Sequence, residues 1–118
     1  MQKKISIVVA DDNQSIRETL KDILSEKGYF VEVVSNGYEL LYYLKEKSPD
    51  IIILDLMMPE KDGIEPFFCI KTISAKSKII IYTGFQRYKD SIYARIADRF
   101  LLKGDTLEEL LESVEELS

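Results

Sequence analysis

The chain has 118 residues, the size of one ordinary domain, and its 46% hydrophobic and 31% charged content is typical of a globular protein. A formal net charge of −5 at pH 7 argues against a broad basic face for nucleic acid and against binding to anionic membrane. The single cysteine excludes an internal disulfide, and the absence of histidine excludes histidine-based acid–base catalysis and the usual zinc sites.

The first half of the chain alternates short apolar runs with segments of helical periodicity. The β-branched content of three runs predicts strands over residues 5–10, 29–34 and 51–54. The spacing of Ile16, Leu20 and Leu24 predicts a helix that ends near Gly28. Candidate starts for this helix are Asp12, Asn13 and a capping box formed by Ser15 and Glu18. Asn36 and Glu39 mark the start of a second helix, which ends before residues 48–50.

The second half continues the same alternation. Residues 59–63 are expected to form a loop, and residues 64–74 a helix in which Pro66 falls in the first turn. Two further strands are predicted over residues 78–82 and 100–102, with a weaker helix between them over residues 90–96. The last helix has the clearest pattern, and Thr106 with Glu109 predicts a capping box at its start.

Strands and helices therefore alternate five times, with no linker, repeat or low-complexity tract. Several strands are apolar on both faces, which indicates a parallel sheet that helices cover on both sides. Right-handed crossovers between parallel strands then give one doubly wound α/β domain over residues 1–118.

Polar residues follow four of the five predicted strands. They are Asp11 and Asp12 after the first strand, Asp55 after the third, Thr83 after the fourth and Lys103 after the fifth. Any one of them has an ordinary explanation as a cap, a turn residue or a solvated side chain. In a parallel sheet, however, the carboxyl ends of the strands meet at one rim, where ligands bind. We therefore expect these side chains to share one crevice.

Three carboxylates in one crevice repel one another, and a divalent cation relieves that repulsion. Mg²⁺ prefers oxygen ligands and binds with one or two carboxylates, waters and a phosphate. We expect Asp11, Asp12 and Asp55 to hold Mg²⁺, with the backbone carbonyl of Met57 as a neutral ligand. A carboxylate beside Mg²⁺ can attack phosphorus and form an acyl phosphate, whose charge Lys103 could pair with and to which the Thr83 hydroxyl could donate.

Four separated segments carry a family resemblance: residues 9–12, residues 55–59 with 62–63, residues 83–84 and residues 100–103. Together they resemble the receiver domain of bacterial two-component response regulators over essentially the whole chain. The resemblance implies a flavodoxin-like five-stranded sheet of order 2-1-3-4-5. It also implies a phosphoacceptor signalling domain and not an enzyme with a diffusible substrate.

The resemblance implies a role for each matching residue. Asp55 would accept a phosphoryl group from the phosphohistidine of a sensor kinase or phosphotransferase, and Asp11 and Asp12 would hold Mg²⁺. Thr83 would move toward the phosphate, and Phe100 would turn inward. The surface of the fourth helix, fifth strand and fifth helix would then bind an output protein or a fused output domain, with a phosphorylation-dependent dimer as a further expectation.

The chain departs from the family pattern around the fourth helix. Gly104 follows Lys103 where many receivers have proline, and Ile96-Ala97 replaces the usual Gly-Ala. The fourth helix is therefore expected to be short, displaced or poorly ordered. With no signal-peptide core and no long apolar run, a cytoplasmic protein is expected, in which Cys69 is a small buried side chain.

Two alternatives remain open. A magnesium-dependent phosphatase of the haloacid dehalogenase type would carry a second aspartate two residues after Asp55, where this chain has Met57. A degenerate receiver that acts only as a binding module is disfavoured by the intact carboxylates, Thr83 and Lys103. The sequence does not distinguish a stand-alone receiver from the amino-terminal part of a longer regulator.

Overall fold

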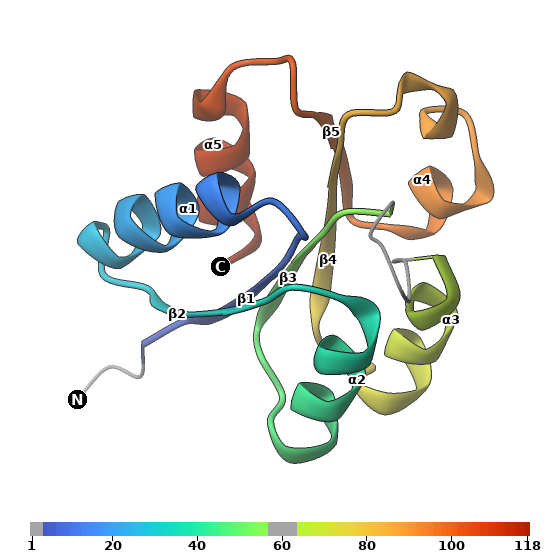
Figure 1. The fold of residues 1–118 in the computed structure, drawn as a ribbon, viewed down its shortest axis with the longest axis horizontal. Coiled ribbons are helices and arrows are strands. Elements are labelled where there is room, and N and C mark those ends of the chain that lie inside the picture. Colours follow the sequence, from blue (N-terminus) through green and yellow to red (C-terminus); the bar gives the residue numbers. More distant parts are fainter. Residues whose placement is uncertain (1–3, 57–63) are drawn as a thin grey trace.

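The computed structural model describes residues 4–56 and 64–118. The chain folds into three layers, with helices on each face of a central sheet (Figure 1). The strands are β1 Ser6–Ala10, β2 Phe30–Val34, β3 Ile51–Leu54, β4 Lys78–Thr83 and β5 Arg99–Leu102. The α-helices are α1 Gln14–Glu26, α2 Gly37–Glu46, α3 Ile64–Ile73, α4 Ile92–Ile96 and α5 Leu107–Leu117, with a 3₁₀ turn over Gln86–Tyr88.

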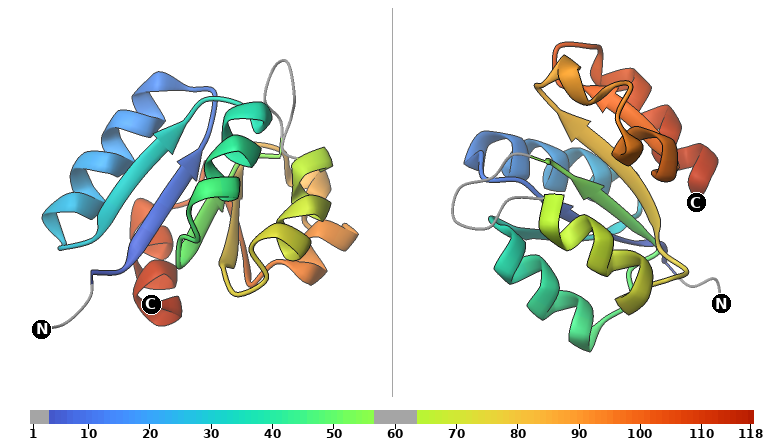
Figure 2. Two further views of the ribbon diagram at one scale, coloured as in Figure 1. Left: turned by 90° about the horizontal axis from the view of Figure 1, so that it is seen from below. Right: turned by 90° about the vertical axis from the view of Figure 1, so that its right-hand side faces the viewer.

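All strand pairs are parallel, and the order across the sheet is β2-β1-β3-β4-β5. This confirms the doubly wound fold and the strand order expected from the resemblance. Figures 1 and 2 show α1 and α5 on one face of the sheet and α2, α3 and α4 on the other. β2 is the strand at one edge, and β5 is the strand at the other.

The sheet separates two apolar cores. One contains Leu20 and Leu24 of α1 with Leu110 of α5, and the other contains Leu40 of α2 with Phe67 of α3. Strands β1, β3 and β4 contribute alternate residues to both cores. Because both of their faces are covered, these strands carry apolar residues on both faces, as the sequence predicted.

The helix starts show where the sequence-based prediction was right and where it was wrong. Asn13 caps α1 by accepting a hydrogen bond from the Ile16 amide at 3.1 Å, which decides between the three candidate starts. Thr106 occupies the cap position of α5, but its side chain makes no capping hydrogen bond, so the predicted capping box there is wrong. Cys69 is half-buried and not the fully buried side chain that was expected.

The segment between β4 and β5 is the least regular part of the described chain. A single 3₁₀ turn precedes α4, which has only five residues. The expectation of a short fourth helix is therefore confirmed. Within residues 4–56 and 64–118, no helix is long and apolar enough to cross a bilayer.

Candidate functional site

The carboxyl ends of the central strands bring the predicted acidic residues together. Asp11 follows β1 and Asp55 follows β3, and these two strands pair directly in the sheet. The amide of Asp55 donates to the carbonyl of Ala10 at 3.0 Å, which extends the β1–β3 pairing to the rim. The carboxylate oxygens of Asp11, Asp12 and Asp55 all lie within 4.8 Å of one another.

Lys103 joins this cluster from the carboxyl end of β5, the edge strand of the sheet. Its Nζ lies 2.8 Å from Oδ2 of Asp11 and 2.9 Å from Oδ2 of Asp55. Its backbone amide donates to the carbonyl of Thr83 at 2.9 Å, which fixes the start of the loop after β5. One ammonium thus bridges two carboxylates that are 3% and 5% exposed.

Asp11 is held at its backbone and at its side chain. Its amide donates to the carbonyl of Val34 at 3.1 Å, and its own carbonyl accepts from Nη1 of Arg17 at 2.8 Å. Oδ1 of Asp11 accepts from the amide of Asn13 at 2.9 Å, while Oδ2 faces Lys103. These four contacts place the Asp11 carboxylate before any ligand arrives.

The electrostatics of the cluster follow from its burial. Burial raises the pKa of Asp11, and the hydrogen bonds from Lys103 and Asn13 only partly offset that effect. Burial lowers the pKa of Lys103, but the hydrogen bonds and charges of Asp11 and Asp55 outweigh it, so the pKa of the ammonium is raised. The pKa of Asp11 is thus raised mainly by burial, whereas the two neighbouring carboxylates stabilise the charged form of Lys103.

A cavity of about 660 Å³ opens beside the cluster. It is lined by Asp12, Asn13, Gln14, Ser15, Asp55, Gly84, Phe85 and Lys103. Thr83 is fully buried, and its hydroxyl oxygen accepts a long 3.4 Å hydrogen bond from the amide of Phe85. Of the predicted polar residues, Asp12, Asp55 and Lys103 belong to the charged cluster and also line the cavity.

Two other predicted site residues, Phe100 and Met57, are not part of the described cavity. Phe100 is half-buried on β5 and packs against the core under α2 and α3, where Tyr88 and Tyr93 also pack. Met57, whose carbonyl was expected to bind the metal, lies outside the described residues.

Sequence reasoning missed the contacts of Arg17, Asn13 and Phe85 with this site. The sequence indicated Asn13 only as a helix cap. The signal for Arg17 was its place in the first turn of α1, because that turn begins at the rim where Asp11 lies. A long cation in the first turn after two acidic residues can fold back onto the loop that precedes the helix.

The donor set fits a hard divalent cation. Three carboxylates supply oxygen ligands within one small volume, and Asp12 is exposed at the cavity wall, so a cation with bound waters can reach it. Three carboxylates against the single ammonium of Lys103 leave the cluster with a formal excess of negative charge. A bound cation would offset that excess and polarise the oxygens of an anionic ligand.

Comparison with known proteins identifies the family. Residues 7–115 match the family described as "Response regulator receiver domain". The chain belongs to this family. The receiver function expected from the sequence is therefore confirmed, and the protein is a signalling domain.

Relatives of known name support the assignment. Response regulator MprA of Mycobacterium sp. (strain KMS) is 35% identical over 113 residues, which are 91% of this chain and 47% of the relative. Response regulator MprA of Mycobacterium avium (strain 104) is 36% identical over 111 residues, 89% of this chain and 47% of the relative. The chain thus spans about half the length of the curated relatives that it matches.

Solved receiver structures share the fold. Response regulator TrrA of Thermotoga maritima, in complex with Mg²⁺–BeF, has a TM-score of 0.89 at 34% identity, covering 97% of this chain and 99% of TrrA. The complex of TrrA with the histidine kinase ThkA gives a TM-score of 0.86 at 34% identity, covering 96% and 97%. A CheY-like receiver of Methanospirillum hungatei JF-1 gives 0.90 at 25% identity, covering 97% and 93%.

Proposed function

We propose that Asp55 is the phosphoacceptor of this receiver domain. The observation that carries the proposal is the position of its carboxylate, which lies 2.9 Å from the Lys103 ammonium and on the wall of an open cavity. Asp11 also pairs with Lys103 but is not among the residues that line the cavity, and Asp12 lines the cavity while the ion pairs of Lys103 run to Asp11 and Asp55. Asp55 is thus the carboxylate best placed to attack a ligand that enters from solvent.

In the proposed reaction a phosphoryl group moves from a phosphohistidine to Asp55. One Asp55 oxygen attacks phosphorus, and the bond from phosphorus to the imidazole nitrogen of a phosphohistidine breaks. The electron pair stays on the imidazole, and the product is an acyl phosphate. Hydrolysis later reverses the modification, because water attacks phosphorus and returns the carboxylate and inorganic phosphate. Both steps take place on the domain's own residue.

Lys103 would exchange partners during this reaction. In the unmodified protein its ammonium pairs with Asp11 and Asp55. When Asp55 carries a phosphoryl group, the ammonium can follow the new negative charge, which reaches up to about two units. We propose Mg²⁺ as the cation held by the acidic cluster, which supplies further positive charge to the phosphoryl oxygens. TrrA, with 34% identity, was solved with Mg²⁺–BeF, and beryllium fluoride imitates a phosphoryl group.

We propose a sensor histidine kinase as the phosphodonor, because TrrA forms a complex with the kinase ThkA. The proposed output surface includes α4, β5 and α5. On this surface Ile92 and Ile96 are exposed, at 55% and 41%. Thr83 and Phe100 are the proposed link to the phosphoryl group, since Thr83 ends β4 and Phe100 pairs with Ile81 of the same strand. An output domain fused after residue 118 or a separate partner protein could bind this surface.

The test is covalent labelling. The protein is incubated with Mg²⁺ and acetyl phosphate, and intact mass is expected to show one added phosphoryl group. Asp55→Asn should abolish the adduct, whereas Asp50→Asn should keep it. Asp50 is a matched control because it flanks the opposite end of β3, where its carboxylate accepts from the Ser6 amide at 2.8 Å. An adduct that survives Asp55→Asn, or no adduct in the unmodified sequence, would refute the assignment.

A further inference from the structure

The outer edge of β2 is open in the described part of the chain. The amide of Phe30 donates to Ile5, and the carbonyl of Val34 accepts from Asp11, so these two residues turn their backbone groups toward β1. In a parallel pair alternate residues bond to the neighbour, so the groups of Val31 and Val33 point away from the sheet. Within residues 4–56 and 64–118, no strand pairs with that edge.

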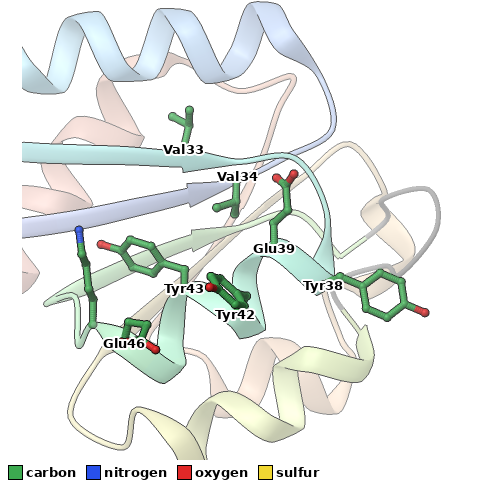
Figure 3. Close-up of a pocket in the computed structure, with 8 residues that line it drawn as sticks. Val33, Val34, Tyr38, Glu39, Tyr42, Tyr43 and Glu46 are labelled. Atoms are coloured by element: carbon green, nitrogen blue, oxygen red, sulfur yellow. The ribbon is translucent and has the colours of Figure 1, made fainter.

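A groove runs beside this edge, between β2 and α2 (Figure 3). Its volume is about 660 Å³. It lies at the β2 edge of the sheet, whereas Lys103 follows β5 at the opposite edge. It is lined by Val33, Val34, Tyr38, Glu39, Tyr42, Tyr43, Glu46 and Lys47. Tyr38 and Tyr42 are 60% and 71% exposed, so two aromatic rings beside the open strand edge face solvent.

The groove has a negative charge pattern. Glu39 and Glu46 lie seven residues apart on α2, so both fall on the face that carries Tyr42 and Tyr43. Hydrogen bonds from the amide and hydroxyl of Ser35 lower the pKa of Glu39, which keeps it ionised at neutral pH.

The basic charge in this groove is already engaged. The ammonium of Lys47 pairs with Glu32 at 2.9 Å, on the strand side of the groove. That pair leaves the carboxylates of Glu39 and Glu46 as the groove's excess charge. A strand edge, aromatic rings and two carboxylates therefore meet in one place.

We propose that this groove binds an extended segment of a partner protein, with a basic–x–apolar–x–basic pattern. The backbone of the segment pairs with Val31 and Val33 as an additional strand. Its central apolar side chain packs on Tyr42. Its basic side chains, about 13 Å apart in an extended strand, reach Glu39 and Glu46, which are about 10 Å apart along the helix.

A second hollow beside β2 favours an added strand over a helix as the form of the bound segment. A cavity of about 540 Å³ lies on the other face of β2 and includes Phe30, Val31, Glu32 and Val33. Phe30 is 50% exposed. An added strand projects side chains to both faces, so it would occupy both hollows, whereas a helix laid in the groove would occupy one.

The test uses the synthetic peptide acetyl-Thr-Arg-Thr-Leu-Thr-Arg-Thr-amide as the probe, with binding measured by fluorescence anisotropy. Binding should shift the amide resonances of β2 and α2, and the peptide with glutamate in place of arginine should bind at least about tenfold more weakly. Two copies are N-methylated on alternate amides. One of them should lose binding, because only one set of amides faces the sheet.

The two groove positions that are varied, Tyr42 and Glu46, lie outside the buried core and the phosphoryl cavity. Tyr42→Ser and Glu46→Lys should each weaken binding about tenfold, since each removes a major contact. Glu115→Lys, a matched charge reversal at an exposed position of α5, should change the peptide affinity less than about twofold. Asp55→Asn should bind the peptide normally, which separates this proposal from the phosphoacceptor assignment.

Three results would overturn the proposal. The first is no binding of the arginine peptide at about millimolar concentration, and the second is equal loss of affinity in Glu115→Lys and Glu46→Lys. The third is a concentration-dependent dimer that Tyr42→Ser dissociates, because the occupant of the edge would then be a second copy of this chain.

Discussion

Replacing Lys103 with methionine tests the electrostatic account of the site most directly. Methionine keeps the length and apolar stem of lysine but removes the ammonium. Asp11 and Asp55, which are 3% and 5% exposed, would then face each other without their shared cation. The substitution should destabilise the metal-free domain and at the same time increase its affinity for Mg²⁺.

The expected loss of stability follows from the burial of the pair. Removing one partner of a buried ion pair costs about 3–5 kcal/mol. The Lys103 side chain is 21% exposed, so the lower end applies, and we expect a loss of about 3 kcal/mol at neutral pH. An exposed pair contributes less than about 1 kcal/mol. Lys47→Met, which breaks a pair with side chains 54% and 34% exposed, is therefore the matched control.

The pH dependence distinguishes charge from packing. Lys103 has a raised pKa in the folded state, so its contribution is fully present below its ordinary pKa and is lost only as the pH rises through the raised value. The raised pKa of Asp11 also makes stability fall as the pH rises, but in the acid range, because ionising that buried carboxyl costs folding free energy. In Lys103→Met the carboxyls take up protons more readily, so the deficit should shrink as the pH falls from about 7 to about 5.

The assay is urea unfolding of the wild type, Lys103→Met and Lys47→Met at both pH values, with and without Mg²⁺. A unit charge at about 4 Å contributes more than a tenfold change in affinity near a protein surface. Mg²⁺ should therefore bind Lys103→Met at least about tenfold more tightly, by calorimetric titration. A deficit that is equal at both pH values, or equal to that of Lys47→Met, would refute the reasoning.

Three further substitutions test separate contacts. Asp11→Asn removes a carboxyl whose ionisation burial disfavours, so unfolding free energy should change by less than about 1 kcal/mol, while Mg²⁺ affinity measured by titration should fall at least about tenfold. An unchanged Mg²⁺ affinity would exclude Asp11 from the site. Arg17→Met frees the Asp11 carbonyl and should cost about 2 kcal/mol in urea unfolding, with Arg17→Lys recovering part of it. Equal loss in both would mean that packing and not the hydrogen bond matters. Glu39→Gln should lower stability by less than about 1 kcal/mol at neutral pH, because this carboxylate is exposed. Its pKa is lowered in the folded state, so the difference from wild type should disappear as the pH falls through that lower value. A difference that persists in acid would contradict this.

Periodicity was sufficient for most of the fold. Strand β3 was predicted at its observed bounds because a short, mostly β-branched run between Asp50 and Asp55 favours a strand that is covered on both faces. The gathering of Asp11, Asp55 and Lys103 was also predictable, since parallel strands must end at a common rim. Both conclusions depend on covalent order and on the geometry of the sheet, which sequence patterns report.

Contacts at the helix ends were less predictable. Asn13 and Thr106 are both of types favoured at helix starts, yet of these two only the Asn13 side chain makes the capping hydrogen bond. The half-burial of Cys69 was not visible in its apolar neighbours, because exposure depends on how α3 is rotated against the sheet. A local pattern states what a side chain can do, and packing decides whether it does so.

By itself the sequence determined the order of elements, the parallel sheet and the set of polar residues at its rim, because these follow from hydrophobic period and chain connectivity. Only the tertiary structure decided that Lys103 bridges Asp11 and Asp55, that Arg17 folds back onto the Asp11 carbonyl, and that a groove lies open beside β2. These features depend on distances of a few ångströms between segments far apart in the chain. Such distances are set by the packing of whole helices and strands, which no single segment encodes.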